Sequence, residues 1–197
     1  MSIIFNYNKI SLVLFFLFIY SFTNATEKLE NSRLIIIGDS LIQGYGLPKD
    51  KGFVNQLQKK LLEKKVNILL INGGVSGDTT AGGLSRIDWS ITDDINAVAI
   101  SLGANDMLRG IPPSFSKENL SKIIMKVKEN NLPILLIGIK SIENYGAEYK
   151  NEFDSMFSNL ADEFELYLYP DLMAPILNKE EDLSLYLQED MLHPNEK

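Results

Sequence analysis

The chain has 197 residues, of which 45% are hydrophobic and 23% charged, with 19 basic and 26 acidic side chains. This length suits one domain with a full core and the composition excludes a disordered chain, while a net charge of −7 argues against nucleic acid as a partner. The chain has no cysteine and one histidine, which excludes disulfide scaffolds, thiol nucleophiles and zinc–thiolate sites, so we expect no metal and no cofactor.

The first 25 residues have the pattern of a secretory signal peptide. Lys9 precedes an apolar run over residues 10–22, and Thr23 and Ala25 are the small residues of a cleavage site. The run is shorter than the ~20 residues of a membrane span. We therefore predict a signal peptide over residues 1–25 and a mature domain over residues 26–197, which is periplasmic or secreted and not stably anchored in a membrane. The alternative is an uncleaved N-terminal anchor.

Five short apolar runs along the mature chain are typical of strands buried on both faces. They occupy residues 34–37, 67–71, 97–102, 133–137 and 165–169. Near-continuous apolar runs of this length are characteristic of parallel sheets, because both faces of such sheets are covered.

Several segments between these runs have apolar residues at helical spacing. Such faces lie between Gly52 and Lys65, within residues 117–130 and within residues 147–164. Alternating strands and helices joined by right-handed crossovers predict an α/β protein. The predicted architecture is a three-layer α/β/α sandwich with a five-stranded parallel sheet, similar to flavodoxin.

Glycines and small polar residues follow three of the predicted strands. Ser40 comes shortly after the first strand, Gly77 after the second and Asn105 after the third. Open parallel sheets bind ligands beyond the carboxyl ends of their strands, so these residues are expected at one edge of the sheet. Each also has a purely structural explanation, as a helix cap for Ser40 and as turn residues for Gly77 and Asn105.

Ser40, Asp190 and His193 could together carry out nucleophilic catalysis. A serine hydroxyl needs a base to become a nucleophile, and a carboxylate holds that base in the required tautomer. His193 is the sole histidine of the chain, and Asp190 precedes it by three residues. Pro194 disfavours helical backbone at His193 and so places the imidazole at the boundary of an element. We predict Ser40 as the nucleophile, His193 as the base and Asp190 as the group that orients it.

Acyl transfer also requires hydrogen-bond donors for the oxyanion of its transition state. The backbone N–H groups of Ser40 and Gly77 and the side-chain amide of Asn105 are one donor from each strand end. We predict that these three groups form the oxyanion hole.

Four sequence blocks, in order, resemble the SGNH hydrolases, also known as GDSL-type esterases. The blocks lie at residues 38–41, 76–79, 103–106 and 190–195, and the resemblance covers nearly all of residues 33–197. Within that family the chain is most similar to bacterial periplasmic enzymes with thioesterase, arylesterase and lysophospholipase activity. The resemblance implies the roles assigned above to the serine, the aspartate, the histidine and the three oxyanion donors.

The resemblance also implies a substrate-binding region and a final helix. Residues 107–113 correspond to a mobile loop over the acyl chain in the family. The implied substrate-binding side chains are Met107, Leu108, Ile111 and Tyr145. Ordinary loop packing would equally explain their apolar character. In the family a helix follows the last block and packs on the sheet, whereas this sequence ends four residues after His193, so the C-terminal helix is expected to be missing.

These observations predict a monomeric serine esterase that hydrolyses small-molecule carboxylic esters and thioesters through an acyl-serine intermediate. Two alternatives stay open. The same residues could deacetylate a carbohydrate, which only a comparison of substrates would distinguish. The chain could instead be a truncated, non-catalytic α/β domain that binds an anion at its strand-end glycines.

Overall fold

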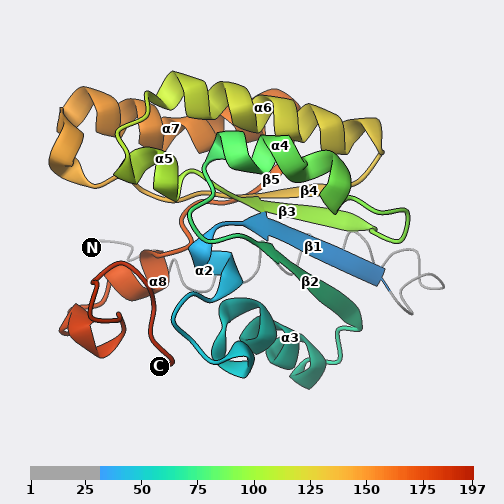
Figure 1. Ribbon diagram of the computed structural model, residues 1–197, viewed down its shortest axis with the longest axis horizontal. Helices are drawn as coiled ribbons and strands as arrows, with labels where there is room; N and C mark the ends of the chain where they lie inside the picture. The colour runs from blue at the N-terminus through green and yellow to red at the C-terminus, as the bar shows by residue number, and fades with distance from the viewer. Residues whose placement is uncertain (1–31) are drawn as a thin grey trace, which may run out of the picture.

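The computed structural model describes residues 32–197, so the predicted signal peptide lies outside the described residues. Five parallel strands form one sheet in the order β2-β1-β3-β4-β5 (Figure 1). The strands are β1 (Ser32–Gly38), β2 (Ile68–Gly74), β3 (Ala97–Ser101), β4 (Ile134–Ile137) and β5 (Tyr167–Tyr169). All five predicted strands are therefore confirmed, and so is their parallel pairing.

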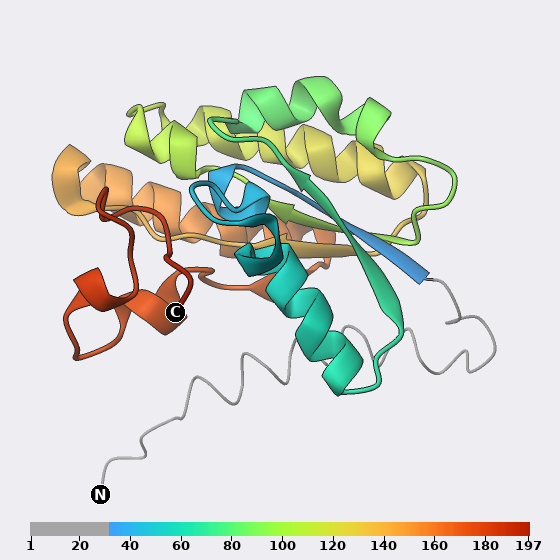
Figure 2. The ribbon, with the colours of Figure 1, turned by 60° about the horizontal axis from the view of Figure 1, so that its bottom comes forward.

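Helices cover both faces of this sheet. The longer helices are α3 (Phe53–Glu63), α4 (Thr80–Ser90), α6 (Pro113–Glu129) and α7 (Gly146–Phe164). The short helical segments are α2 (Ser40–Gln43), η1 (Lys49–Lys51), α5 (Ala104–Leu108), η2 (Glu143–Tyr145), α8 (Ala174–Leu177) and η3 (Leu183–Leu185). Helices α4, α6 and α7 lie on one face and α2, α3 and α8 on the other (Figures 1 and 2), which confirms the three-layer sandwich.

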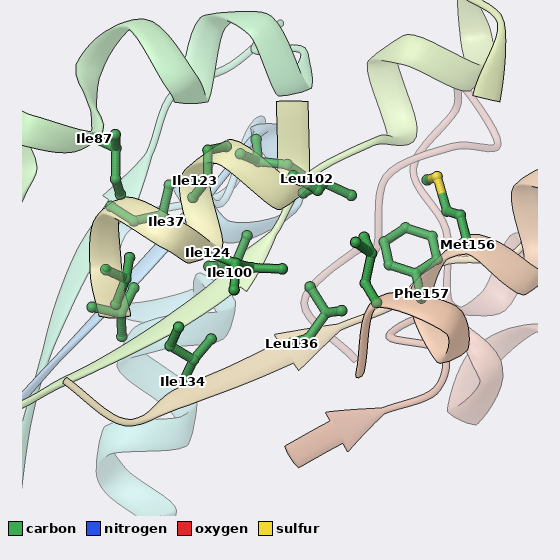
Figure 3. Packing of buried hydrophobic residues seen from close by; sticks show 14 of the residues in the cluster. Ile37, Ile87, Ile100, Leu102, Ile123, Ile124, Ile134, Leu136, Met156 and Phe157 are labelled. Atoms are coloured by element: carbon green, nitrogen blue, oxygen red, sulfur yellow. The ribbon is translucent and has the colours of Figure 1, made fainter. Parts of the chain in front are cut away.

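The main core lies between the sheet and helices α4, α6 and α7. Strand residues that point to this face, such as Ile37, Ile100 and Leu136, are completely buried. They pack against isoleucines of α4 and α6 and against phenylalanines of α7 (Figure 3). Successive residues of a strand point to opposite faces, so the apolar runs supply a second core on the other side.

The second core packs against α3 and continues into an open groove. Leu34 and Ile36 of β1 contact the cluster that contains Val54 and Leu61 of α3. A groove of about 660 Å³ extends over β3, β4 and β5 toward α8, and one end reaches the site around Ser40. Residues 186–197 form no helix.

Helix α4 has no counterpart among the helices predicted from the sequence. Gly82 and Gly83 lower the helix propensity of this segment, so its apolar pattern is weak. The tertiary structure requires one of these glycines, because a Cβ at Gly83 would lie 2.2 Å from a methyl group of Leu102. The Thr79 side chain caps the helix by accepting a hydrogen bond from the Gly82 N–H, 3.2 Å away. None of the helices over residues 32–197 is long and apolar enough to cross a bilayer.

Candidate active site

Ser40 lies at a sharp turn between β1 and α2, at the carboxyl edge of the sheet. The Asp39 side chain caps α2 by accepting a hydrogen bond from the Leu41 N–H at 3.0 Å, which makes Ser40 the first helical residue. The turn requires Gly38, because a Cβ there would lie 2.2 Å from a side-chain carbon of Ile42. The Ser40 N–H has no helical carbonyl before it and is free to donate elsewhere.

His193 comes from the far end of the chain and meets Ser40 directly. Its Nε2 lies 2.8 Å from the Ser40 Oγ, and its Nδ1 lies 2.6 Å from the Asp190 Oδ2. The ring also contacts the Tyr45 ring, with 4.8 Å between centroids. The structure thus joins the three predicted residues in one hydrogen-bonded chain, in which the imidazole can take a proton from the serine while the carboxylate holds its other nitrogen.

The loop that carries Asp190 and His193 is closed by hydrogen bonds to the Asp190 carboxylate. The other carboxylate oxygen accepts from the His193 N–H at 3.0 Å and the Leu192 N–H at 2.9 Å. These two backbone donors, with the imidazole, lower the pKa of Asp190 to about 2. Met191 has a φ of 56° in this loop, a conformation that costs energy for a residue other than glycine. Because its pKa is about 2, Asp190 is ionised at all pH values near 7.

The three residues predicted to supply the oxyanion donors line the same pocket. Ser40, Gly77 and Asn105 line one pocket of about 210 Å³ together with His193. Gly77 has a φ of 82°, in the left-handed region that favours glycine. The Asn105 amide donates one hydrogen bond to the Asp78 carbonyl at 3.0 Å, which leaves its second N–H available to a ligand.

The pocket next to Ser40 has largely apolar walls. Met107 and Leu108, two of the side chains predicted to bind substrate, line it. Both belong to helix α5, so the segment from 107 to 113 is only partly a loop. The other aliphatic and methionine side chains of the wall are Leu41, Ala104, Ile139, Ile142, Met173 and Leu192.

Ile111 and Tyr145 lie outside the lining of this pocket. The Tyr145 hydroxyl donates to the Leu108 carbonyl at 3.1 Å, and the Tyr149 hydroxyl donates to the Ile111 carbonyl at 2.9 Å. The two tyrosines thus fix the backbone at residues 108 and 111 by hydrogen bonds. Tyr145 thus contacts the backbone of a residue that lines the pocket, and its own side chain does not line it.

Asp39 is a buried carboxyl that directly precedes Ser40 in the chain. Its side chain is 1% exposed, and burial raises its pKa to about 6. The hydrogen bond from Leu41 and the proximity of His193 oppose this increase. Asp39 therefore changes its charge near pH 6.

Comparison with known proteins identifies the family of this chain. Residues 36–197 match the model of the GDSL-like Lipase/Acylhydrolase family. The chain belongs to this family. The predicted family resemblance is thereby confirmed over almost all of the described residues.

Relatives within the GDSL-like family are similar along most of their length. An arylesterase of Vibrio mimicus is 37% identical over 188 residues, which cover 94% of this chain and 88% of the relative. The thioesterase 1/protease 1/lysophospholipase L1 of Escherichia coli K12 is 33% identical over 163 residues, covering 82% and 75%. The crystal structure of the psychrotrophic esterase EstA from Pseudoalteromonas, inhibited by monoethylphosphonate, has a TM-score of 0.78 at 35% identity, covering 84% and 88%.

Arg86 and Gln188 are among the side chains that hold this GDSL-like site together and that were not found from the sequence. Arg86 of α4 bonds to Gly38, two residues before Ser40, and to Asp78, which follows Gly77. Gln188 links the His193 segment to the loop after α2. An arginine on a helix and a glutamine in a loop have no distinctive pattern. The sequence signal that could have found them is their spacing from the family blocks. Arg86 comes eight residues after Asp78, and Gln188 comes two residues before Asp190.

Proposed function

We propose that this chain hydrolyses carboxylic esters and thioesters of small molecules through an acyl-Ser40 intermediate. The observation that carries the proposal is the continuous contact from Ser40 Oγ to His193 Nε2, at 2.8 Å, and from His193 Nδ1 to Asp190, at 2.6 Å. The names of the relatives, an arylesterase and a thioesterase/lysophospholipase, support both bond types. Their sequence similarity extends over nearly the whole domain.

The first half-reaction acylates the serine. As Ser40 Oγ attacks the carbonyl carbon, its proton passes to His193 Nε2, and the carbonyl oxygen takes up negative charge. The carbon–oxygen or carbon–sulfur bond to the leaving group then breaks, and His193 returns the proton to the departing alcohol or thiol. Asp190 stays ionised and stabilises the imidazolium that forms between these steps.

The second half-reaction releases the acid. A water molecule gives its proton to His193 Nε2 while its oxygen attacks the acyl carbon of the ester on Ser40. The second tetrahedral intermediate collapses, the proton passes to Ser40 Oγ, and the carboxylic acid leaves. The free enzyme is regenerated.

The oxyanion in both half-reactions is stabilised by three donors. The N–H groups of Ser40 and Gly77 and the Asn105 amide act on the charge that develops on the carbonyl oxygen. Removing one such donor costs about 10²–10³ in turnover in other acyl-transfer enzymes.

The acyl group occupies the apolar pocket beside Ser40. Met107 and Leu108 contact the acyl chain, while Ile111 and Tyr145 act on it indirectly, through the backbone of the pocket wall. The apolar wall favours acyl substrates over acetylated sugars, which require polar partners for their hydroxyl groups.

The proposal is tested by replacing the nucleophile. Ser40→Ala is expected to abolish hydrolysis of p-nitrophenyl butyrate and covalent labelling by a fluorophosphonate probe. Ser158→Ala, at a serine on α7 that is exposed and remote from the site, is the matched control and is expected to retain both. Retained turnover by the Ser40 variant would refute the proposal, and a rate for acetylated sugars above that for acyl esters would favour a carbohydrate esterase.

We further propose that residues 1–25 direct export and that the mature chain acts as a monomer. The apolar run of residues 10–22 and the small residues before Thr26 support a cleaved leader. The first residues of the exported protein, determined by N-terminal sequencing, are expected to begin at Thr26. Light scattering of the same material gives its oligomeric state.

A further inference from the structure

Arg86 makes two contacts that connect separate parts of the site. It belongs to helix α4, and its side chain is 22% exposed. Its Nε donates to the Asp78 Oδ2 at 2.6 Å, and its Nη2 donates to the Gly38 carbonyl at 3.0 Å. Both contacts lie within hydrogen-bonding distance, and in both the donor is the charged guanidinium.

The two acceptors adjoin the groups that would bind the oxyanion. Gly38 is two residues before Ser40, at the end of β1, and Asp78 directly follows Gly77. The Asp78 backbone carbonyl also accepts the hydrogen bond of the Asn105 amide, at 3.0 Å. The backbone segments and the side chain that supply all three proposed donors are therefore connected through Asp78 and Arg86.

The position of the Asp78 carboxylate is closely defined by α4. A Cβ at Gly82 would lie 2.5 Å from the Asp78 Oδ1, so the carboxylate packs directly on the first turn of the helix. Arg86 lies one turn further along, and helical side chains lean toward the N-terminus, which directs its guanidinium back to this point. The glycine and the arginine thus hold the carboxylate from two sides.

The Gly38 carbonyl has a second hydrogen-bond partner, in the segment between β2 and α4 that contains Gly77. It accepts a hydrogen bond from the Val75 N–H at 3.0 Å as well as that from Arg86. Arg86 itself lines neither the 210 Å³ pocket nor the 660 Å³ groove. Its effect on a reaction at Ser40 would therefore pass through the backbone.

We propose that Arg86 is a positioning residue that holds the β1 end and the loop of Gly77 in the arrangement required to bind the oxyanion. This inference rests on the proposed function. The planar guanidinium serves two acceptors in different directions at once, whereas a lysine ammonium on a flexible stem would not hold both in this geometry. Arg86 contacts no reacting atom and is not a catalytic residue.

The first test is the kinetics of Arg86→Ala and Arg86→Lys with p-nitrophenyl butyrate. Both are expected to lower kcat about 10- to 100-fold with little change in KM, since a displaced donor loses transition-state stabilisation rather than ground-state binding. Added guanidinium is expected to restore part of the kcat of Arg86→Ala, which sodium chloride at equal concentration does not. A merely structural role would not produce this selective rescue.

The matched control is Arg33→Ala. Arg33 lies on β1, at the end of the strand opposite Gly38, and this substitution removes its ion pair with Asp94. Arg33 Nε lies 3.0 Å from the Asp94 Oδ2, far from the carboxyl edge. Its kcat is expected to equal that of the unchanged protein. Asp78→Asn, which keeps the size of the side chain but weakens the ion pair, serves if the arginine variants do not fold, and its kcat is expected to fall in the same way.

A double-mutant cycle with Asn105→Ala distinguishes action through the oxyanion donors from other effects. If Arg86 acts through those donors, its loss costs less in the Asn105→Ala background than in the unchanged protein. An unchanged kcat in folded Arg86→Lys and Asp78→Asn, or fully additive losses in the cycle, would overturn the role of Arg86 and leave the proposed function standing. The absence of any Ser40-dependent activity in the unchanged protein would instead overturn the proposed function.

Discussion

At the scale of single residues, two carboxylates near Ser40 have opposite properties because their surroundings differ. Asp190 accepts backbone hydrogen bonds and has a pKa lowered to about 2, whereas burial raises the pKa of Asp39 to about 6. Asp190 therefore remains a carboxylate under all ordinary conditions and can orient His193 throughout. Of these two carboxyls, Asp39 is the one that changes its charge near pH 6.

Asp39→Asn is expected to change the pH dependence of stability. The folded pKa of Asp39 lies above its ordinary value of 3.8, so its contribution to stability is fully present below pH 3.8 and is lost as the pH rises through 6. Asparagine stays neutral and still accepts from the Leu41 N–H. Relative to the unchanged protein, the variant is expected to gain about 2–3 kcal/mol of unfolding free energy between pH 4 and pH 8. Urea unfolding at both pH values measures this gain, and a difference that does not vary with pH would contradict it.

At the scale of elements, the site depends on side chains that join one segment to another. The buried Asp106 carboxylate of α5 accepts the Thr80 N–H at 2.8 Å and the Ser116 hydroxyl at 3.0 Å. It thus ties the starts of α4 and α6 to the short helix that carries Asn105. The His193 segment has no regular element of its own and is held by Gln188.

Gln188→Ala is expected to weaken the placement of His193. The Gln188 side-chain amide donates to the Tyr45 carbonyl at 2.8 Å and the Pro194 carbonyl at 2.9 Å, and so joins the tail to the loop after α2. Its loss is expected to lower kcat about tenfold, because a misplaced base transfers protons less efficiently. The rate of p-nitrophenyl butyrate hydrolysis measures this effect. Gln58→Ala, remote from the site, is the control. Equal activity of the two variants would exclude the role of Gln188.

At the scale of the whole molecule, the two faces of the sheet are covered unequally. Helices α4, α6 and α7 close one face, whereas the face of α3 carries the groove of about 660 Å³. Apolar surface beside an open groove makes fewer contacts than the same surface in a closed core, so substitutions there cost less.

Adjacent leucines of β4 test this asymmetry. Leu136 points into the closed core and is fully buried, whereas Leu135 lines the groove. Leu136→Ala is expected to lower the unfolding free energy by about 2–5 kcal/mol, and Leu135→Ala by distinctly less. Urea unfolding of the two variants measures the difference. Equal losses would show that the groove side is packed as tightly as the core.

The sequence by itself determined the α/β class, the five parallel strands, and the candidate residues Ser40, Asp190 and His193. These follow from local patterns, because a buried parallel strand must be apolar on both faces and the chain has a single histidine. Helix α4 escaped prediction because its two glycines weaken the local pattern, while the reason for Gly83 is a tertiary contact with Leu102 that local propensity cannot register.

Only the tertiary structure decided which side chains hold the site together. Arg86, Asp106 and Gln188 act through contacts with residues distant in sequence, 143 positions away for Gln188 and Tyr45. It also decided that Met107 and Leu108 line the pocket while Ile111 and Tyr145 lie outside it. The physical reason is that composition and periodicity reflect the burial of single elements, whereas a site is formed by side-chain directions and distances that exist only after the elements pack.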